Sequence, residues 1–301
     1  MRTVILAFLA SLSFGFSVPA IADQSMTVGE ACRRISARLA SVSMDLCERS
    51  QLKLTGAVSH NDFPILMRSV PAASPSDKEE PIRVLLIGGI HGDELTSISV
   101  VFQWMELLDT PQARKLHWHI APLVNPDGLF AKPAQRMNAR GVDLNRNFPT
   151  PGWEHDSRTY WVKRTGRDPR RYPGDAPLSE PESRWLDEEM ARFRPDVIIS
   201  VHAPFGILDF DGPRTPPRKF GRLHLSQLGV YPGSLGNYGG VHKKVPVITI
   251  ELPNASTMPP KAEMLRIWRD MLGWIERHGQ GGPELIPVGG RPASETALID
   301  H

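Results

Sequence analysis

Four side chains of the kinds that bind or assist a hydrolytic metal ion stand out in the sequence, namely His91, Glu94, His202 and Glu251. Two imidazoles and one carboxylate are typical of catalytic zinc sites, because three protein ligands leave one coordination position for water. A carboxylate outside the ligand set can act as the general base of hydrolysis. We therefore expect a single Zn2+ held by His91, Glu94 and His202, with Glu251 as the base.

The elements that must position these side chains are apolar segments of strand length. Residues 82–87, 196–201 and 245–252 have the composition of strands buried on both faces. In open parallel sheets, ligands bind at the carboxyl ends of the strands, so these segments can bring the four side chains together. Each residue alone has a simpler interpretation. A His-x-x-Glu spacing arises by chance, and His202 could be a core histidine.

Strands and helices alternate along the chain, which predicts an α/β protein with a mostly parallel sheet. Further elements are expected as follows: a hairpin at 50–70 with its turn at 59–62, a strand at 116–122, and helices at 95–108, 179–192 and 261–278. Residues 123–178 read mainly as loop. Ser179 and Glu182 are expected to form a capping box. A catalytic domain is predicted at 49–280, after a helical segment at 23–48 and before a tail at 281–301.

The first 22 residues have the pattern of a secretory signal peptide. Arg2 is followed by an apolar run and by the small-residue pattern Ala20-Ile21-Ala22, which favours cleavage after Ala22. A retained membrane anchor is the alternative, but the apolar run is short for a span of about 20 residues. We therefore expect an exported protein with no membrane association after cleavage.

The two cysteines, Cys32 and Cys47, lie early in the exported chain. An oxidising compartment favours a disulfide between them, which would tie a helix at 28–39 to the following segment. Two free buried thiols are the alternative. Pairing across this short loop would contribute on the order of 3 kcal/mol.

The overall composition sets limits on function. The chain has 301 residues, 41% hydrophobic and 23% charged, with a net charge of +2. These values are typical of a globular protein and argue against a dedicated nucleic-acid binder, which usually has a strong basic excess. We expect a monomer.

The segment after the predicted strand at 116–122 carries the most specific motifs, Asn125-Pro126-Asp127-Gly128, Arg136 and Asp143-Leu144-Asn145-Arg146-Asn147. With the His-x-x-Glu motif, the later His202 and the final Glu251, the chain resembles the zinc carboxypeptidases of the carboxypeptidase A-like family over roughly residues 55–278. The resemblance implies a three-layer α/β/α fold with a mixed, mostly parallel central sheet, and one Zn2+. A polar surface turn is the alternative for residues 143–147.

The resemblance also implies roles for individual side chains. Arg136 matches the arginine that stabilises the oxyanion, and Asn145 and Arg146 match the pair that binds the terminal carboxylate of the substrate. Asp143 matches the acceptor for the ring N–H of the first zinc histidine. Tyr231 matches the tyrosine that closes over that carboxylate, with Tyr238 as a rival because the spacing to Glu251 is slightly short.

Within the family, Trp153 after the Asn-Arg-Asn-Phe-Pro motif, the Ser-Glu-Pro-Glu segment and residues 231–236 resemble members that trim bacterial cell-wall peptides. This implies hydrolysis of the γ-D-glutamyl–meso-diaminopimelate amide of murein stem peptides or released muropeptides, with release of terminal diaminopimelate in the periplasm. The same-class alternatives are a general exported zinc carboxypeptidase and a deacylase of acyl-amino acids. A non-catalytic cell-wall-binding protein is the alternative from a different class.

Three further features have two interpretations each. Asp209 or Asp211 could bind the ammonium of diaminopimelate, although a turn around Asp211-Gly212 is the simpler reading. The basic segment 158–171 could meet an anionic wall polymer, but a solvated loop is favoured. His117 and His119 alternate onto one strand face away from the other site residues, so we expect them to be structural.

Overall fold

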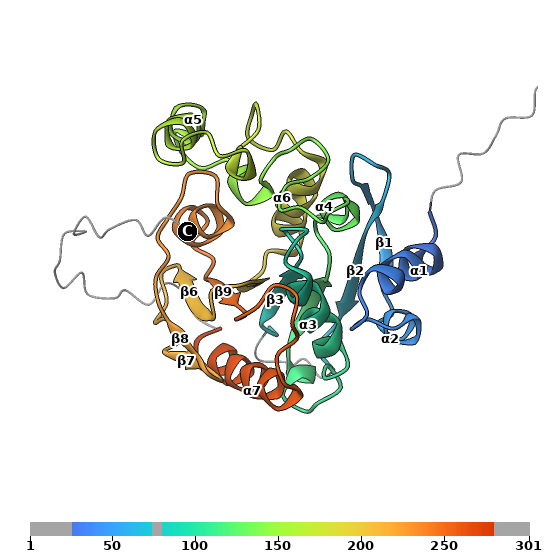
Figure 1. Ribbon diagram of the computed structural model, residues 1–301. Coiled ribbons are helices and arrows are strands. Elements are labelled where there is room, and N and C mark those ends of the chain that lie inside the picture. The colour runs from blue at the N-terminus through green and yellow to red at the C-terminus, as the bar shows by residue number, and fades with distance from the viewer. Residues whose placement is uncertain (1–25, 74–79, 280–301) are drawn as a thin grey trace, which may run out of the picture.

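The computed structural model describes residues 26–73 and 80–279, which form one sheet covered by helices (Figure 1). The predicted signal peptide at 1–22 and the predicted tail at 281–301 lie outside the described residues. The helical segment at 26–48 packs against the chain that follows it, because residues of both belong to one apolar core.

The sheet of the described residues has nine strands in the order β1-β2-β4-β3-β5-β9-β6-β8-β7. The strands are β1 (Lys53–Val58), β2 (Pro64–Val70), β3 (Arg83–Gly88), β4 (His117–Ala121), β5 (Val197–His202), β6 (Ile207–Asp211), β7 (Lys219–Phe220), β8 (Leu223–Leu225) and β9 (Val247–Glu251). The central strands β4, β3, β5 and β9 are parallel, whereas β2 and β6 join them antiparallel on either side. The mixed, mostly parallel sheet is therefore confirmed at its centre.

Helices cover both faces of this sheet (Figure 1). They are α1 (Val28–Arg38), α2 (Met44–Arg49), α3 (Leu95–Met105), α4 (Pro126–Phe130), α5 (Trp153–Lys163), α6 (Pro181–Phe193) and α7 (Lys261–His278), with the π-helix η4 (Gly236–His242). One apolar core joins the sheet to α1, α2, α3 and α7, and a second joins it to α6 and η4. These two cores define the predicted three-layer α/β/α fold.

The predicted disulfide is present between Cys32 on α1 and Cys47 on α2, across a sequence separation of 15 residues. Both cysteines are fully buried in the core that contains α3 and α7. Thr27 caps α1 through its side chain, and Glu30 completes the capping box. The first helices are therefore fixed both to each other and to the sheet domain.

Residues 123–178 are mostly irregular chain, as expected, but the helices α4 and α5 form within them, and the strongly polar sequence of α5 gave no apolar stripe. The strands β6 to β8 were not predicted. The capping box at Ser179 and Glu182 is wrong: Glu180 is the N-cap residue, and the Ser179 hydroxyl donates to Glu180 Oε1 instead.

His117 and His119 are structural, as expected from their alternation on β4. The His119 ring stacks on Phe193 of α6 with centroids 3.6 Å apart, and its Nδ1 contacts Glu189 of the same helix. The His117 ring packs edge-on against Phe193. Both imidazoles therefore serve the contact between the sheet and α6.

Candidate active site

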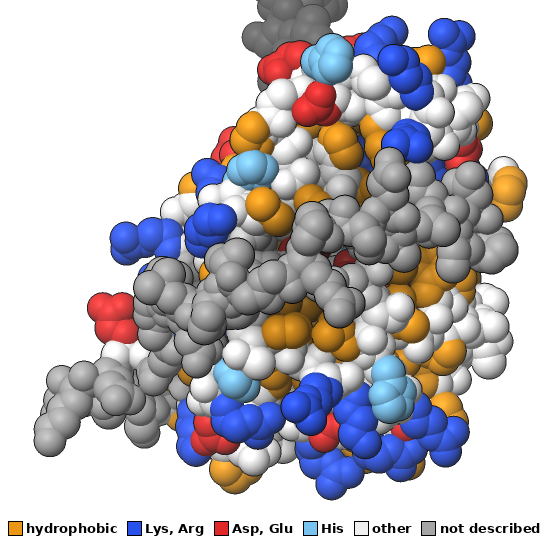
Figure 2. All heavy atoms as spheres, turned by 90° about the vertical axis from the view of Figure 1, so that its left-hand side faces the viewer, with side chains coloured by type: hydrophobic (Ala, Val, Ile, Leu, Met, Phe, Trp, Pro, Cys, Tyr) orange, Lys and Arg blue, Asp and Glu red, His pale blue; other side chains and the backbone are white. Residues whose placement is uncertain are grey.

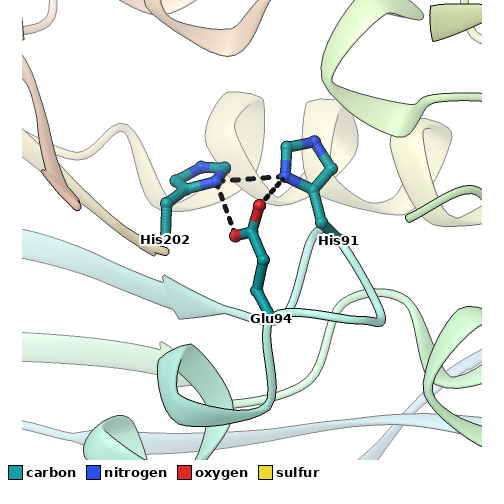
Figure 3. Close-up of side chains that lie close together, drawn as sticks. All are labelled: His91, Glu94 and His202. Atoms are coloured by element: carbon teal, nitrogen blue, oxygen red, sulfur yellow. Dashed lines mark hydrogen bonds and ion pairs between the residues drawn. The ribbon is translucent and has the colours of Figure 1, made fainter. Parts of the chain in front are cut away.

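His91, Glu94 and His202 converge at the carboxyl ends of β3 and β5 (Figure 3). His91 Nδ1 lies 2.7 Å from Glu94 Oε1, and His202 Nδ1 lies 3.1 Å from Glu94 Oε2. The two Nδ1 atoms are 3.2 Å apart. Each residue is no more than 6% exposed. The sequence thus brings two imidazole nitrogens and one carboxylate to a single buried point.

The local backbone makes this convergence possible. Gly88 ends β3 and Gly89 follows it, both in close contact with neighbouring chain, since a Cβ on Gly88 would lie 2.9 Å from the Ser97 carbonyl oxygen and one on Gly89 would lie 2.6 Å from Ile98. Gly89 also has a φ of +60°, which favours glycine. The chain turns there and places His91 and Glu94 just before α3, facing the end of β5.

Polar partners fix the orientation of both imidazoles. His91 Nε2 lies 3.2 Å from Asp143 Oδ1, and Ser200 Oγ lies 2.9 Å from His202 Nε2. Because a polar partner occupies Nε2 of each histidine, the Nδ1 atom of each ring faces the centre of the group and can bind a metal. Such an outer partner is usual for histidines that bind metals. Burial would raise the pKa of Glu94, but the neighbouring imidazoles outweigh it and hold that pKa well below its ordinary value.

Arg136 lies against this group rather than apart from it. Its Nε donates to Asp143 Oδ2 at 2.9 Å, and its Nη1 lies 3.1 Å from His91 Nδ1 and 3.7 Å from Glu94 Oε1. Burial would raise the pKa of Asp143, but Arg136 and His91 hold it well below the ordinary value. A fixed cation therefore stands beside the point where the three donor groups meet.

Glu251 ends β9 directly beside His202, because the two residues are paired across the parallel β5–β9 ladder. It is 5% exposed, and its Oε2 has no hydrogen-bond partner in the described part of the chain. Burial raises the pKa of Glu251 to about 7. Such a carboxylate is suited to accept and return a proton near neutral pH.

Asn145 and Arg146 lie on the short helix η2 (Leu144–Arg146), which follows Asp143. Arg146 is 5% exposed, and its buried Nε has no hydrogen-bond partner among the described residues. Its guanidinium lies 4.6 Å from the centre of the Tyr231 ring. A nearly buried cation with a free donor is suited to a carboxylate ligand, which a guanidinium can bind through two hydrogen bonds.

The two tyrosines named from the sequence occupy different environments. Tyr231 is half-buried over Arg146, and its hydroxyl donates to the Leu228 carbonyl at 2.6 Å. Tyr238 is 4% exposed, stacks on Phe148 with centroids 5.7 Å apart and donates to Asp187 of α6. The rival Tyr238 is therefore a core residue, and Tyr231 is the tyrosine next to Arg146.

The residues present fit a zinc ion. The ligand atoms of His91, Glu94 and His202 all lie within 4.8 Å of one another. Two imidazole nitrogens and one carboxylate are ligands that suit Zn2+. The three side chains are buried, and neighbouring polar groups fix the orientation of both imidazoles. A second group of this kind in the described residues, His60, Glu180 and Glu182, is different because the Asn138 amide donates to both carboxylates.

Comparison with known proteins agrees with the fold. The sequence profile of the family described as zinc carboxypeptidase matches residues 46–205. The chain belongs to the zinc carboxypeptidase family, and it is accordingly a hydrolase. The matched residues include the three candidate ligands, Arg136 and the segment 143–147, and they end before Glu251.

Among relatives, murein peptide amidase A of Escherichia coli (strain K12) is 31% identical over 220 residues, which cover 70% of this chain and 85% of that protein. The crystal structure of murein-tripeptide amidase MpaA from Escherichia coli O157 superposes with a TM-score of 0.51 at 26% identity, covering 74% of this chain and 92% of that one. Bovine thrombin-activatable fibrinolysis inhibitor has a TM-score of 0.56 at 17% identity, covering 83% and 94%, and shows the shared fold alone.

Several polar residues around the site were missed or left open by the sequence analysis. Ser200 went unnoticed, although the pattern Ser-x-His on a strand places both side chains on one face. Asp209 lies on β6 and is 6% exposed. A turn was expected around Asp211-Gly212, but Asp211 is the last residue of β6, and the chain bends from Gly212, which has a φ of +143°.

The basic segment 158–171 lies on the surface. Lys163 and Arg164 at the end of α5 are exposed, as are Arg158, Arg167 and Arg170. Figure 2 shows Lys and Arg side chains gathered at the upper end of the face where α5 lies, and again at the lower end over β7, β8 and α7. Arg170 forms an ion pair with Asp93 at 2.8 Å.

Within the described residues, no helix has the length and apolar character needed to span a membrane.

Proposed function

We propose that this chain is a zinc-dependent amidase of murein stem peptides. It would hydrolyse the amide bond between γ-D-glutamate and terminal meso-diaminopimelate and release diaminopimelate. The observation that carries the proposal is the buried convergence of His91, Glu94 and His202, flanked by Glu251 and Arg136. The substrate class is supported by the similarity to murein peptide amidase A.

The proposed roles follow from the contacts of each side chain. His91, Glu94 and His202 would hold one Zn2+, and a bound zinc ion polarises the scissile carbonyl and lowers the pKa of water. Glu251 takes the proton from the attacking water and later returns it to the leaving amine, for which its raised pKa is suited. Arg136 lies where it can stabilise the negative charge that develops on the carbonyl oxygen.

The terminal carboxylate of the substrate would be bound by Asn145 and Arg146, with Tyr231 over the guanidinium. Asp143 keeps His91 and Arg136 in place by accepting from both. This arrangement selects a substrate with a free carboxylate next to the scissile amide, as terminal diaminopimelate has. The proposed location is the periplasm, supported by the signal-peptide pattern of residues 1–22.

The test incubates the zinc-loaded protein with L-Ala-γ-D-Glu-meso-diaminopimelate and identifies the products by mass spectrometry. We expect free diaminopimelate and the dipeptide L-Ala-D-Glu. Glu251→Gln should lower kcat by 10²- to 10⁴-fold, in the range of general-base catalysis, while zinc stoichiometry stays unchanged. His91→Ala serves as the matched control that should lose zinc itself.

The alternatives give different products. A general carboxypeptidase would release ordinary C-terminal residues from α-linked peptides and leave the tripeptide intact. A deacylase would cleave N-acyl amino acids instead. Either result refutes the proposed substrate, and undiminished cleavage by Glu251→Gln refutes the proposed mechanism.

A further inference from the structure

The strand β6 brings a second carboxylate to the face of the sheet that carries Glu251. It runs antiparallel to β9, with Ile207 opposite Glu251 and Asp209 opposite Thr249. Residues directly opposite one another in such a pair point to the same face, and alternate residues share that face. Asp209 therefore lies on the same face as Glu251, one step further along the sheet from the candidate metal ligands.

The Asp209 carboxylate is buried without a cation. It is 6% exposed, and its Oδ1 accepts the Leu228 N–H at 3.1 Å. Within the described residues, no Lys or Arg side chain forms an ion pair with it, and burial raises its pKa, partly offset by hydrogen bonds from the backbone N–H groups of Leu228 and Phe210. A buried carboxylate of this kind is costly unless a cation partners it.

A chain of contacts joins Asp209 to Arg146. Leu228 donates its N–H to Asp209 and accepts the Tyr231 hydroxyl through its carbonyl. The Arg146 guanidinium in turn lies 4.6 Å from the centre of the Tyr231 ring. Asp209 is thus connected to the group proposed to hold the terminal carboxylate. The terminal residue of a substrate would have its carboxylate at Arg146 and its amide at Glu251, so its side chain would extend beside β6.

We propose that Asp209 binds an ammonium group at the far end of the terminal residue's side chain, so that the enzyme selects terminal residues that carry a distal ammonium. This inference rests on the proposed function and specifies which part of diaminopimelate is recognised. The ammonium supplies the positive partner that the buried carboxylate lacks. A neutral or acidic side chain would leave the carboxylate unpaired and would bind poorly.

Asp211 provides a matched control on the same strand. It lies on the same face, opposite Val247 of β9. However, η4 covers it, because a Cβ on Gly236 would lie 2.0 Å from Asp211 Oδ2 and a Cβ on Gly240 would lie 2.5 Å from its backbone oxygen. The two acids thus share chemistry and strand, but only Asp209 is joined by contacts to Arg146.

The test compares three tripeptides of the form L-Ala-γ-D-Glu-X with the zinc-loaded full chain. X is meso-diaminopimelate, L-2-aminopimelate, which lacks only the distal ammonium, or L-lysine, which lacks the distal carboxylate. For the wild type we expect kcat/KM to fall roughly 10- to 100-fold from diaminopimelate to 2-aminopimelate, as for a lost charge-assisted hydrogen bond. The lysine peptide should be cleaved better than the 2-aminopimelate peptide.

Asp209→Asn should abolish most of this preference, by lowering kcat/KM for the diaminopimelate peptide and leaving the 2-aminopimelate peptide nearly unchanged. The asparagine oxygen can still accept the Leu228 N–H, and thermal unfolding with zinc stoichiometry checks that the variant folds. Asp211→Asn should keep the wild-type preference. Should Asp209→Asn fail to fold, the wild-type ratio between the two pimelate peptides decides alone.

The outcomes separate the two proposals. If the wild type cleaves the diaminopimelate and 2-aminopimelate peptides equally well, the role of Asp209 is refuted and the proposed function stands. The same holds if folded Asp209→Asn keeps the full preference. If none of the three peptides is cleaved, the proposed function is refuted, and the inference falls with it.

Discussion

Glu182 at the start of α6 allows a test of how burial changes the pKa of a carboxyl group in this fold and, through it, the free energy of unfolding. It is fully buried, its Oε2 accepts the Asn138 amide at 3.2 Å, and its Oε1 has no hydrogen-bond partner in the described part of the chain. Burial raises the pKa of Glu182 to about 7, and the negative charges of Asp127 and Glu180 add to the effect. The substitution Glu182→Gln removes the ionisation and keeps an oxygen for Asn138.

The sign and size of the effect follow from linkage. The unfolded chain has an ordinary glutamate pKa of about 4.3, so the folded state binds more protons between that pH and about 7. The contribution of Glu182 to stability is full below the unfolded pKa and is lost as pH rises through the folded pKa. With about 1.4 kcal/mol for each pH unit, the loss at pH 8 is on the order of 4 kcal/mol.

The assay is urea unfolding of the wild type and Glu182→Gln at pH 5 and pH 8. The variant should be more stable than the wild type at pH 8 by up to about 4 kcal/mol, and this gain should shrink towards pH 5. Glu180→Gln is the matched control, because Glu180 accepts from Asn138, Ser179 and His60, which lower its pKa against the effect of burial. That control should be destabilised at pH 8. A gain that is the same at both pH values, or a less stable Glu182→Gln at pH 8, would show that the reasoning is wrong.

Two further predictions concern the disulfide and the loop beside Arg146. Replacing Cys32 and Cys47 together by alanine should lower the free energy of unfolding by about 3 kcal/mol from the lost cross-link, plus a smaller packing loss, and should make stability insensitive to dithiothreitol. Equal wild-type stability with and without the reductant would contradict this. Gly233→Ala should raise KM for the cleaved peptide, because a Cβ there would lie 1.9 Å from the Arg146 carbonyl oxygen. Gly229→Ala also has a positive φ, but a Cβ there meets nothing within 4 Å, so it should cost stability and leave KM unchanged. Equal KM values for the two variants would argue against the Arg146 contact.

The candidate metal ligands were predictable from the sequence because each lies at or just beyond the end of a long apolar strand. A run such as residues 82–87 identifies both the strand and its direction, and the first charged residues after it must lie at the sheet edge. His202 and Glu251 followed by the same reasoning. The resemblance to the zinc carboxypeptidases then supplied Arg136 and Asp143, which come from irregular chain with no periodic signal.

The parts that could not be predicted are those whose structure depends on long-range contacts. The strand β6 is only five residues long and alternates apolar and acidic residues before Gly212, which reads equally well as a turn. Its pairing with β9 decides the matter, and that pairing joins residues far apart in the sequence. The choice between Tyr231 and Tyr238 likewise depended on packing that the sequence does not show. Tyr238 is buried and contacts Phe148 and Asp187, whereas Tyr231 does not.

The antiparallel pairing of β6 with β9 separates the residues proposed for hydrolysis from those proposed for substrate selection. The candidate metal ligands and Glu251 lie at or just beyond the ends of three neighbouring parallel strands at the centre of the sheet, β3, β5 and β9. The groups proposed to choose among substrates belong to the next strand and to the connection that leads into η4. Preference for a different leaving amino acid could therefore evolve by exchanging a few residues on this flank, with the bond-breaking apparatus left intact.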